Sequence, residues 1–174
     1  VAISKKGGDV SDPGDYRPIT LESVFLKCYE LVLMKRLQEW AEEAGALHDS
    51  QYGFRRKRGT QDAIMHILGA ADCRRYCRRG DGEEPKRTWV AFLDIRKAYD
   101  TVQHPVLLAM LRKAGIVGPM WRAIHSMYDN ASRQMRVRTE MSPPWQVVAG
   151  VMQGAVLSPL LFSLYINELA VRLE

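Results

Sequence analysis

The first half of the chain contains two stretches in which apolar residues recur at helical spacing. One begins at Thr20, a residue type that caps helices, and runs to about Ala44, where Gly45 is expected to end it. The second begins at Thr60, and its apolar stripe, which we expect to lie in the core, comprises Ala63, Ile64, Ile67, Leu68 and Ala71. The pattern predicts two helices joined by a loop over residues 48–59.

Three more helices are predicted in the second half of the chain. They cover approximately residues 104–115, 119–131 and 158–174. Pro105 and Pro159 fall at the first helical positions of the first and last of these segments. Proline at that position is typical of a helix start, because the missing N–H would have no intrahelical partner there.

The remaining apolar residues follow strand patterns. Residues 90–95 form a short apolar run, and residues 133–139 alternate apolar with polar side chains. Residues 145–151 are expected to pair back as a hairpin across a turn at 142–144, while the polar segment 1–18 should be extended or looped. Helices and antiparallel strands are thus mixed without a regular β–α–β alternation, which predicts an α+β fold.

Length and composition agree with a globular protein. The 174 residues suit one domain or a large part of one, and 47% of them are hydrophobic and 26% charged. No apolar run approaches the roughly 20 residues needed to span a bilayer, so we expect no membrane partner. The chain begins without Met and ends inside a predicted helix. We therefore expect it to be a fragment of a longer protein.

The three cysteines do not indicate a disulfide framework and favour a reducing, intracellular compartment. Cys73 and Cys77 lie four residues apart, but the nearest further ligand type is His66. No second pair at zinc-like spacing follows, so a zinc site is disfavoured. Any role of the two cysteines stays open.

Positive charge is concentrated between Gln51 and Gly80. This segment has eight Lys and Arg residues against two Asp, a net charge of +6, whereas the entire chain has +5. Clustered arginines suit phosphate contacts, which are electrostatic and independent of sequence. The alternative is a solvated surface without a partner. The charge favours nucleic acid or nucleotides over a membrane as the partner.

The apolar run 90–95 delivers a carboxylate, Asp94, and a second one, Asp100, follows six residues later. A carboxylate in such an apolar setting is costly to bury without a cation, hydrogen-bond donors or water. Aspartates at strand ends commonly hold Mg²⁺, which takes one or two protein carboxylates together with substrate phosphates. The alternative is that Asp94 caps the turn that follows.

Three further segments accompany Asp94. Residues 15–19 join the first loop to the first helix, residues 51–60 form a basic loop, and residues 150–159 connect a strand to the last helix. Taken singly, they are explained as a turn, a solvated loop and a tight connection.

Taken together and in this order, these segments resemble the fingers and palm of a reverse transcriptase. The resemblance covers about residues 5–174. It is strongest to enzymes of non-LTR (LINE-like) retrotransposons, to which the enzymes of group II introns are related. The matching motifs are Tyr16–Leu21, Gln51–Thr60, Phe92–Asp100 and Gly150–Pro159.

The resemblance implies a right-hand polymerase fold, with a fingers-like segment at 1–87 and a partial palm at 88–174. The Tyr-x-Asp-Asp hairpin, which carries the family's other metal ligands, does not occur in the chain, and neither does the thumb. The isolated chain is therefore expected to lack polymerase activity. An exposed palm edge should also favour self-association.

The resemblance also assigns roles to the motif residues in two-metal nucleotidyl transfer. Asp94, with the backbone carbonyl of Ile95, would be the catalytic and metal-binding group for Mg²⁺, with Mn²⁺ as an alternative. Five residues would contact the dNTP: Arg55 and Arg58 at the triphosphate, Tyr99 beneath the sugar, and Gln153 and Gly154 in the nucleotide pocket.

The implied partners are an RNA template, a DNA primer and dNTPs, and the implied location is the nucleus. Nucleic acid would be contacted by four exposed arginines: Arg74, Arg75, Arg78 and Arg79. Two alternatives remain, a non-catalytic module that binds RNA or an RNA–DNA hybrid, and an intron maturase. Whether the parent protein is active, its target and template preference, the host and the oligomeric state are not determined by the sequence.

Overall fold

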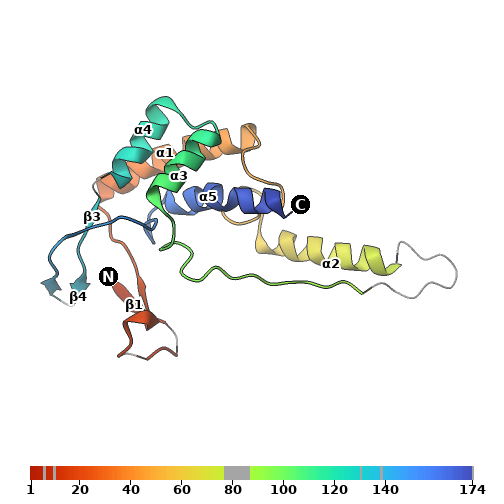
Figure 1. Cartoon of the computed structure of the whole chain (residues 1–174), viewed down its shortest axis with the longest axis horizontal. Coiled ribbons are helices and arrows are strands. Elements are labelled where there is room, and N and C mark those ends of the chain that lie inside the picture. The colour runs from red at the N-terminus through yellow and green to blue at the C-terminus, as the bar shows by residue number, and fades with distance from the viewer. Residues whose placement is uncertain (6, 10, 77–86, 130, 138, 174) are drawn as a thin grey trace.

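The computed structural model describes the chain except for residues 6, 10, 77–86, 130, 138 and 174. Helices predominate, and short antiparallel strand pairs accompany them (Figure 1). The helices are α1 (Val24–Glu43), α2 (Thr60–Tyr76), α3 (His104–Lys113), α4 (Gly118–Tyr128) and α5 (Ser158–Arg172). Each lies within or close to a segment that the apolar pattern predicts to be helical. In the described part of the chain, no helix is long and apolar enough to cross a membrane.

Helix α1 begins three residues later than predicted from Thr20. Its N-terminal cap is Ser23, whose hydroxyl oxygen accepts a hydrogen bond from the Leu26 N–H at 3.2 Å. Serine in this position satisfies one of the amides that have no partner within the helix. The prediction of Gly45 as the stop is confirmed, because Gly45 has a φ of +58°, a left-handed conformation that ends helices.

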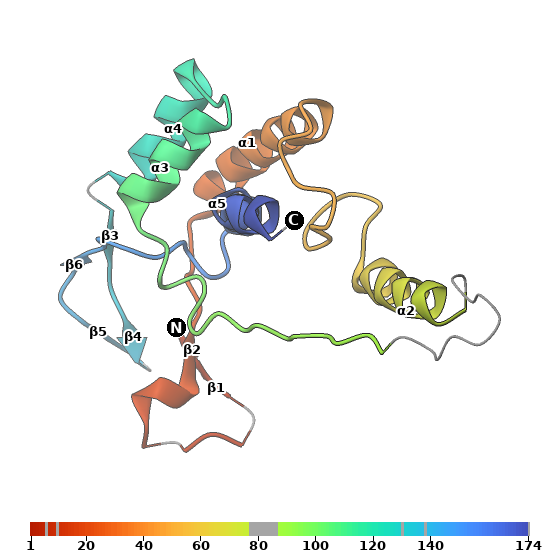
Figure 2. The same cartoon turned by 45° about the vertical axis from the view of Figure 1, so that its right-hand side comes forward.

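The core lies among α1, α3, α4 and α5, which gather on one side of the molecule in Figures 1 and 2. Helix α3 packs against both α4 and α5. Each fully buried aliphatic side chain contributes about 1.5–3 kcal/mol relative to an exposed one. The fully buried members include Leu37, Leu107, Leu111, Ile124, Leu160 and Leu161.

Helix α2 extends away from this four-helix body (Figure 2). The prediction that its apolar stripe lies in the core is wrong, because Ile64, Ile67 and Leu68 are exposed. The spacing of apolar residues identifies a helix and its apolar face, but it does not identify the surface that covers that face.

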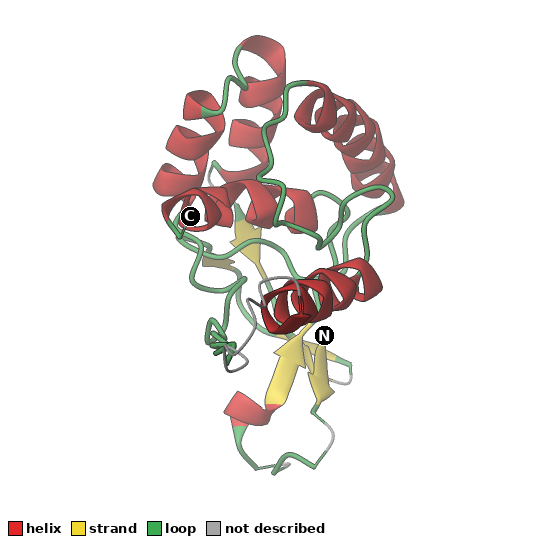
Figure 3. Cartoon of the chain, turned by 90° about the vertical axis from the view of Figure 1, so that its right-hand side faces the viewer, coloured by secondary structure: helices red, strands yellow, loops and turns green. Residues whose placement is uncertain are grey.

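The strands form three antiparallel pairs. β1 (Ala2–Ser4) pairs with β2 (Tyr16–Pro18), so the N-terminal segment is extended as expected. The predicted hairpin is confirmed in a shorter form: β3 (Ser132–Arg133) pairs with β6 (Trp145–Gln146), and β4 (Arg136–Val137) pairs with β5 (Glu140–Met141). Figure 3 shows the β1–β2 ribbon below the helices. The fold is thus a mixture of helices and small sheets, consistent with part of a reverse transcriptase domain.

Residues 90–95 do not form the predicted strand. They are extended but unpaired, and Phe92 and Leu93 are 89% and 82% exposed. A strand requires a neighbour whose backbone groups complete the hydrogen bonds, and no described strand pairs with this segment. Among the residues that the structure describes, the apolar side chains of this segment therefore do not pack on the face of a sheet.

Candidate active site

Residues 150–157, here called the pocket loop, connect β6 to α5 and lie against the turn that contains Tyr99. The Val151 N–H donates to the Tyr99 carbonyl at 2.9 Å, and the Gly150 N–H donates to the Val102 carbonyl at 2.7 Å. These two bonds fix the start of the pocket loop to residues that lie about fifty positions earlier in the chain. Two of the sequence motifs, Phe92–Asp100 and Gly150–Pro159, are thereby brought together.

A third motif meets the pocket loop at its centre. The Thr20 N–H donates to the Gln153 carbonyl at 2.8 Å. Gly154 has a φ of +107°, and a Cβ at this position would lie 3.1 Å from the Thr20 carbonyl oxygen. Glycine is required here both by its backbone conformation and by the close approach of Thr20. The Thr20 segment thus lies against the centre of the pocket loop, whose start lies against the Tyr99 turn.

The Tyr99 side chain packs on helix α5. Its ring packs against Phe162 of α5, with 5.1 Å between ring centroids, and the side chain is half-buried. Burial raises the pKa of the Tyr99 phenol above its ordinary value. The Tyr99 ring is therefore held against Phe162 at the start of α5.

Two buried polar residues next to the pocket loop were not indicated by the motifs. His104 Nε2 donates to the Gly150 carbonyl at 2.9 Å, and Glu30 accepts hydrogen bonds from the Val156 and Leu157 amides. The signal for Glu30 is its spacing, because Glu30 falls on the same face of α1 as the buried residues Leu33 and Leu37. His104 precedes a proline and is interpreted from sequence only as part of a helix start.

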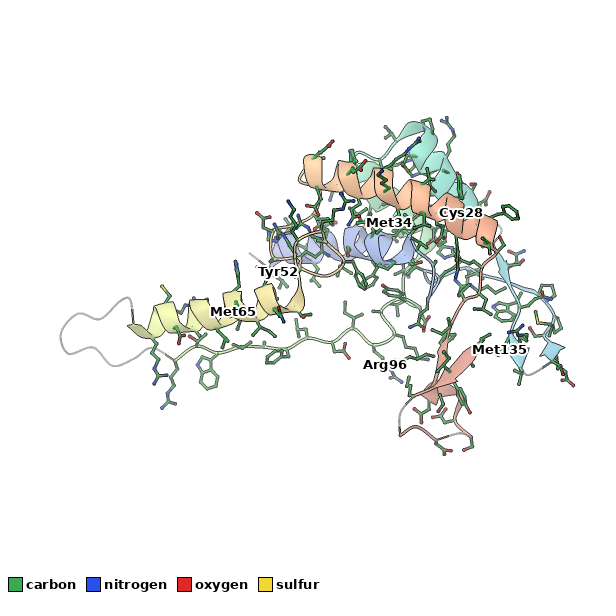
Figure 4. The ribbon with its side chains drawn as sticks, turned by 180° about the vertical axis from the view of Figure 1, so that it is seen from behind. Cys28, Met34, Tyr52, Met65, Arg96 and Met135 are labelled. Atoms are coloured by element: carbon green, nitrogen blue, oxygen red, sulfur yellow. The ribbon has the colours of Figure 1, made fainter. Side chains whose placement is uncertain are left out.

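Asp94 lies on the extended segment outside this group. Asp94 is exposed and Ile95 is 44% exposed. In Figure 4 Arg96, at the end of this segment, lies away from α2 and toward the β1–β2 ribbon. No group of three or more His, Cys, Asp or Glu residues that could hold a metal exists among the described residues. One exposed carboxylate does not make a two-metal site. The residues present therefore cannot hold two metal ions on their own.

The Arg55 side chain is held by hydrogen bonds to other residues of the protein. Its Nε and Nη2 donate to the Glu42 carboxylate at 3.1 and 2.7 Å, its Nη1 donates to the His48 carbonyl at 2.9 Å, and the side chain is only 6% exposed. The Arg55 guanidinium holds the pKa of the Glu42 carboxyl below its ordinary value. The described conformation therefore does not present this guanidinium to a triphosphate.

Arg58 is more accessible. It pairs with Asp49 at 2.7 Å, with 28% of its side chain exposed, and its guanidinium lies 5.7 Å from the centroid of the Tyr52 ring. Tyr52 is labelled in Figure 4 on the loop that precedes α2. Because Asp49 is almost fully exposed, this ion pair is a weak surface pair that an incoming phosphate could replace.

Helix α5 contacts both the Tyr99 turn and the basic loop of residues 51–60. Its Phe162 side chain contacts Tyr99, while its Ser163 carbonyl accepts a hydrogen bond from the Gln51 side chain at 2.9 Å. Among the described residues, no hydrogen bond, ion pair or ring contact joins Asp94 or Arg58 to the pocket loop. The structure thus groups Tyr99, Gln153 and Gly154, and leaves the basic loop and Asp94 outside that group.

Only part of the predicted nucleic-acid-binding face lies among the residues that the structure describes. Arg74 and Arg75 lie in the last turn of α2 and are exposed. Arg78, Arg79 and Cys77 lie outside the described residues. Cys28 and Cys73 are free and exposed.

Comparison with known proteins agrees with the motifs. Residues 3–174 match the family model described as reverse transcriptase (RNA-dependent DNA polymerase). The chain is 33% identical to a probable RNA-directed DNA polymerase from transposon BS of Drosophila melanogaster, over 96% of the chain and 18% of that protein. It is 32% identical to a Pol polyprotein from the type-1 retrotransposable element R2 of Popillia japonica, over 97% of the chain and 22% of that protein.

A further relative is a probable RNA-directed DNA polymerase from the transposon X-element of Drosophila melanogaster, with 31% identity over 96% of the chain. The chain spans about a fifth of the length of these curated relatives. The family match nevertheless extends over nearly all its residues, and it includes all four motifs. This chain belongs to the reverse transcriptase family, the RNA-directed DNA polymerases found in non-LTR retrotransposons.

Proposed function

We propose that residues 1–87 form a fingers-like segment and residues 88–174 part of the palm of an RNA-directed DNA polymerase of a non-LTR retrotransposon. The proposed substrates are dNTPs, an RNA template and a DNA primer with a free 3′-OH. The names of the curated relatives support this activity. Action in the nucleus is proposed from the family resemblance alone.

The observation that carries the proposal is the convergence of three motifs at the pocket loop. Within the loop, the Val151 N–H donates to the Tyr99 carbonyl at 2.9 Å, and the Gln153 carbonyl accepts from the Thr20 N–H at 2.8 Å. Gly154 leaves the loop without a side chain at the point where the backbones approach. We propose that this group binds the incoming dNTP, with the Tyr99 ring beneath the sugar and with Gln153 and Gly154 lining the pocket.

We propose Asp94, with the Ile95 carbonyl, as the part of the catalytic metal site that this chain supplies. Mg²⁺ is the proposed ion, because it binds through one or two carboxylates together with substrate phosphates. The described residues supply too few carboxylates for two metals. The remaining ligands would come from a Tyr-x-Asp-Asp segment, and the isolated chain is expected to be inactive.

Among the arginines, Arg58 is the better candidate for contact with the triphosphate. Its pair with Asp49 is exposed, whereas Arg55 is enclosed with Glu42 and backbone carbonyls. We propose that Arg55 shapes the basic loop and that Arg58 meets the phosphates. Arg74 and Arg75, together with Arg78 and Arg79 outside the described residues, are proposed to contact the nucleic-acid backbone.

RNA-templated primer extension tests the proposal. The assay uses a protein that contains this chain together with a Tyr-x-Asp-Asp segment, and compares Asp94→Asn with Asp129→Asn, an exposed aspartate at the end of α4. Asp94→Asn should abolish extension and preserve RNA binding, while Asp129→Asn should preserve both. Full extension by Asp94→Asn would overturn the assignment, and RNA binding without extension in the unsubstituted protein would favour a non-catalytic binding module.

A further inference from the structure

Glu30 of α1 is a fully buried carboxylate that contacts the pocket loop from a distant part of the chain. Its Oε2 accepts a hydrogen bond from the Val156 N–H at 2.6 Å and a longer one from the Leu157 N–H at 3.3 Å. The side chain is 0% exposed, and 126 residues separate Glu30 from Val156. Burying a charged group is costly, so the contacts that it makes must compensate for lost hydration.

The amides at the start of α5 need a hydrogen-bond acceptor from outside the helix. The cap residue is Leu157, which has no side-chain oxygen to accept a hydrogen bond, and Pro159 lies in the first turn. The first amides of a helix have no intrahelical acceptor, and they form the positive end of the helix dipole. Glu30 of α1 therefore accepts hydrogen bonds from the amide of the cap residue Leu157 and from the preceding Val156 amide, in place of a local side chain.

The Glu30 contact holds the end of the pocket loop in place. Val156 follows Gly154 by two residues, while the other end of the loop is held by the Val151–Tyr99 bond and its centre by the Thr20–Gln153 bond. Neither of those two bonds involves a residue of α1. Without Glu30, the segment between Gln153 and the first turn of α5 loses its only described side-chain acceptor.

We propose that Glu30 is a positioning residue for dNTP binding, which acts by fixing the Val156–Leu157 end of the pocket loop, next to Gln153 and Gly154, against α1. The inference rests on the proposed function of that loop. It assigns no contact between Glu30 and the substrate. Glu30 acts through the Val156 and Leu157 amides, so its removal should affect the nucleotide more than the template–primer.

Steady-state primer extension with the protein used above tests this role. Glu30→Ala should raise KM for dNTP by at least about ten-fold, the factor that corresponds to losing a hydrogen bond to a charged group. Affinity for template–primer should change little, and melting temperatures measured in parallel identify loss of folding. Glu30→Gln, which keeps one acceptor oxygen, should restore part of the effect. Glu39→Gln, at an exposed position of the same helix, should resemble the unsubstituted protein.

Amide hydrogen exchange separates this inference from the proposed function. In the chain as described, Glu30→Gln should speed exchange at Val156 and Leu157, whether or not the loop binds nucleotides. Unchanged exchange at both amides, or a folded Glu30→Ala protein with unchanged KM for dNTP, would overturn the inference. Full activity of Asp94→Asn would instead overturn the proposed function and leave the exchange result valid.

Discussion

The two arginines of the basic loop have different surroundings, although their positions in the motif suggest one shared role. Arg55 is enclosed by Glu42 and by backbone carbonyls, whereas Arg58 pairs with the exposed Asp49. Buried, bidentate pairs depend on the planar guanidinium, while exposed pairs contribute little to stability. The sequence motif identifies both residues as basic but does not reveal which one is buried.

We predict that Arg55→Ala lowers the free energy of unfolding by about 1.5–3 kcal/mol, because Glu42 loses its charged hydrogen-bond donors. Arg58→Ala should lower it by less than about 1 kcal/mol. Urea unfolding monitored by circular dichroism measures both values. Equal losses for the two variants would contradict the structural role assigned to Arg55.

Glu22 gives a second prediction for a single side chain. Both of its carboxylate oxygens are buried without a hydrogen-bond partner in the described structure, and burial, with repulsion from Glu30 as a smaller cause, raises the pKa of the Glu22 carboxyl. The folded state therefore holds this proton to higher pH than the unfolded state does. Glu22 consequently destabilises the fold increasingly as the pH rises above its unfolded pKa and through its raised folded pKa.

We expect Glu22→Gln to be more stable than the unsubstituted chain at pH 7, by about 1 kcal/mol, because the charge is removed from a buried site. The difference should shrink as the pH falls toward 4, where the carboxyl of the unsubstituted chain is protonated. Thermal melting at both pH values measures it. A stability difference that does not depend on pH would show that the Glu22 charge has no such effect.

The secondary-structure elements whose ends are marked by a proline or a glycine were predicted well from sequence. Helix α3 begins at His104, directly before Pro105, and ends at Lys113, shortly before Gly115, and its start and end follow from the backbone preferences of the proline and the glycine. Residues 90–95 could not be predicted in the same way, because an apolar run forms a strand only beside a partner strand. The start of α1 was misplaced because Thr20 and Ser23 are both suitable caps.

The pocket loop allows a prediction about backbone conformation. Gly154→Ala should destabilise the fold by about 1–3 kcal/mol, because φ is +107° and the new Cβ would lie 3.1 Å from the Thr20 carbonyl. Gly69→Ala in α2 is the matched control, since nothing lies within 4 Å of its Cβ position. That variant should stabilise α2 by about 0.5–1 kcal/mol. Chemical unfolding measures the free energy of unfolding of both variants. An unchanged stability for Gly154→Ala would contradict the described loop.

At the scale of the whole molecule, the exposed apolar side chains of the described residues include a run on the extended segment that precedes the Tyr99 turn. Trp89, Phe92 and Leu93 are all more than half exposed, and their backbone lacks a described strand partner. Unpaired apolar segments pair readily with other chains. We therefore predict self-association of the isolated chain, observed as sedimentation coefficients that rise with concentration.

Leu93→Lys should reduce this association, whereas Val148→Lys should not. Both residues are 82% exposed, but Val148 lies apart from the extended segment, near β6. Sedimentation of the two variants at equal concentrations provides the comparison. Monomeric behaviour of the unsubstituted chain, or equal effects of the two substitutions, would contradict the prediction.

The candidate site was predictable from sequence as a set of motifs, and only partly as an arrangement. The Tyr99 turn and the pocket loop that contains Gln153 and Gly154 meet through contacts between segments that lie far apart in sequence. The enclosure of Arg55 depends on Glu42 in another segment, and no motif encodes it. Glu30 likewise gains its role from the capping requirement of α5, which lies more than a hundred residues away.

The measurement that tests the account most directly is sugar discrimination at Tyr99. In RNA-templated primer extension by a protein that contains this chain and a Tyr-x-Asp-Asp segment, kcat/KM is compared for dGTP and GTP. Tyr99→Val should raise the relative use of GTP by at least about ten-fold, because the ring no longer fills the space of the ribose 2′-OH. Tyr99→Phe, which keeps the ring, should retain the original preference. An active Tyr99→Val protein with unchanged discrimination would show that the pocket loop and Tyr99 do not form the nucleotide site.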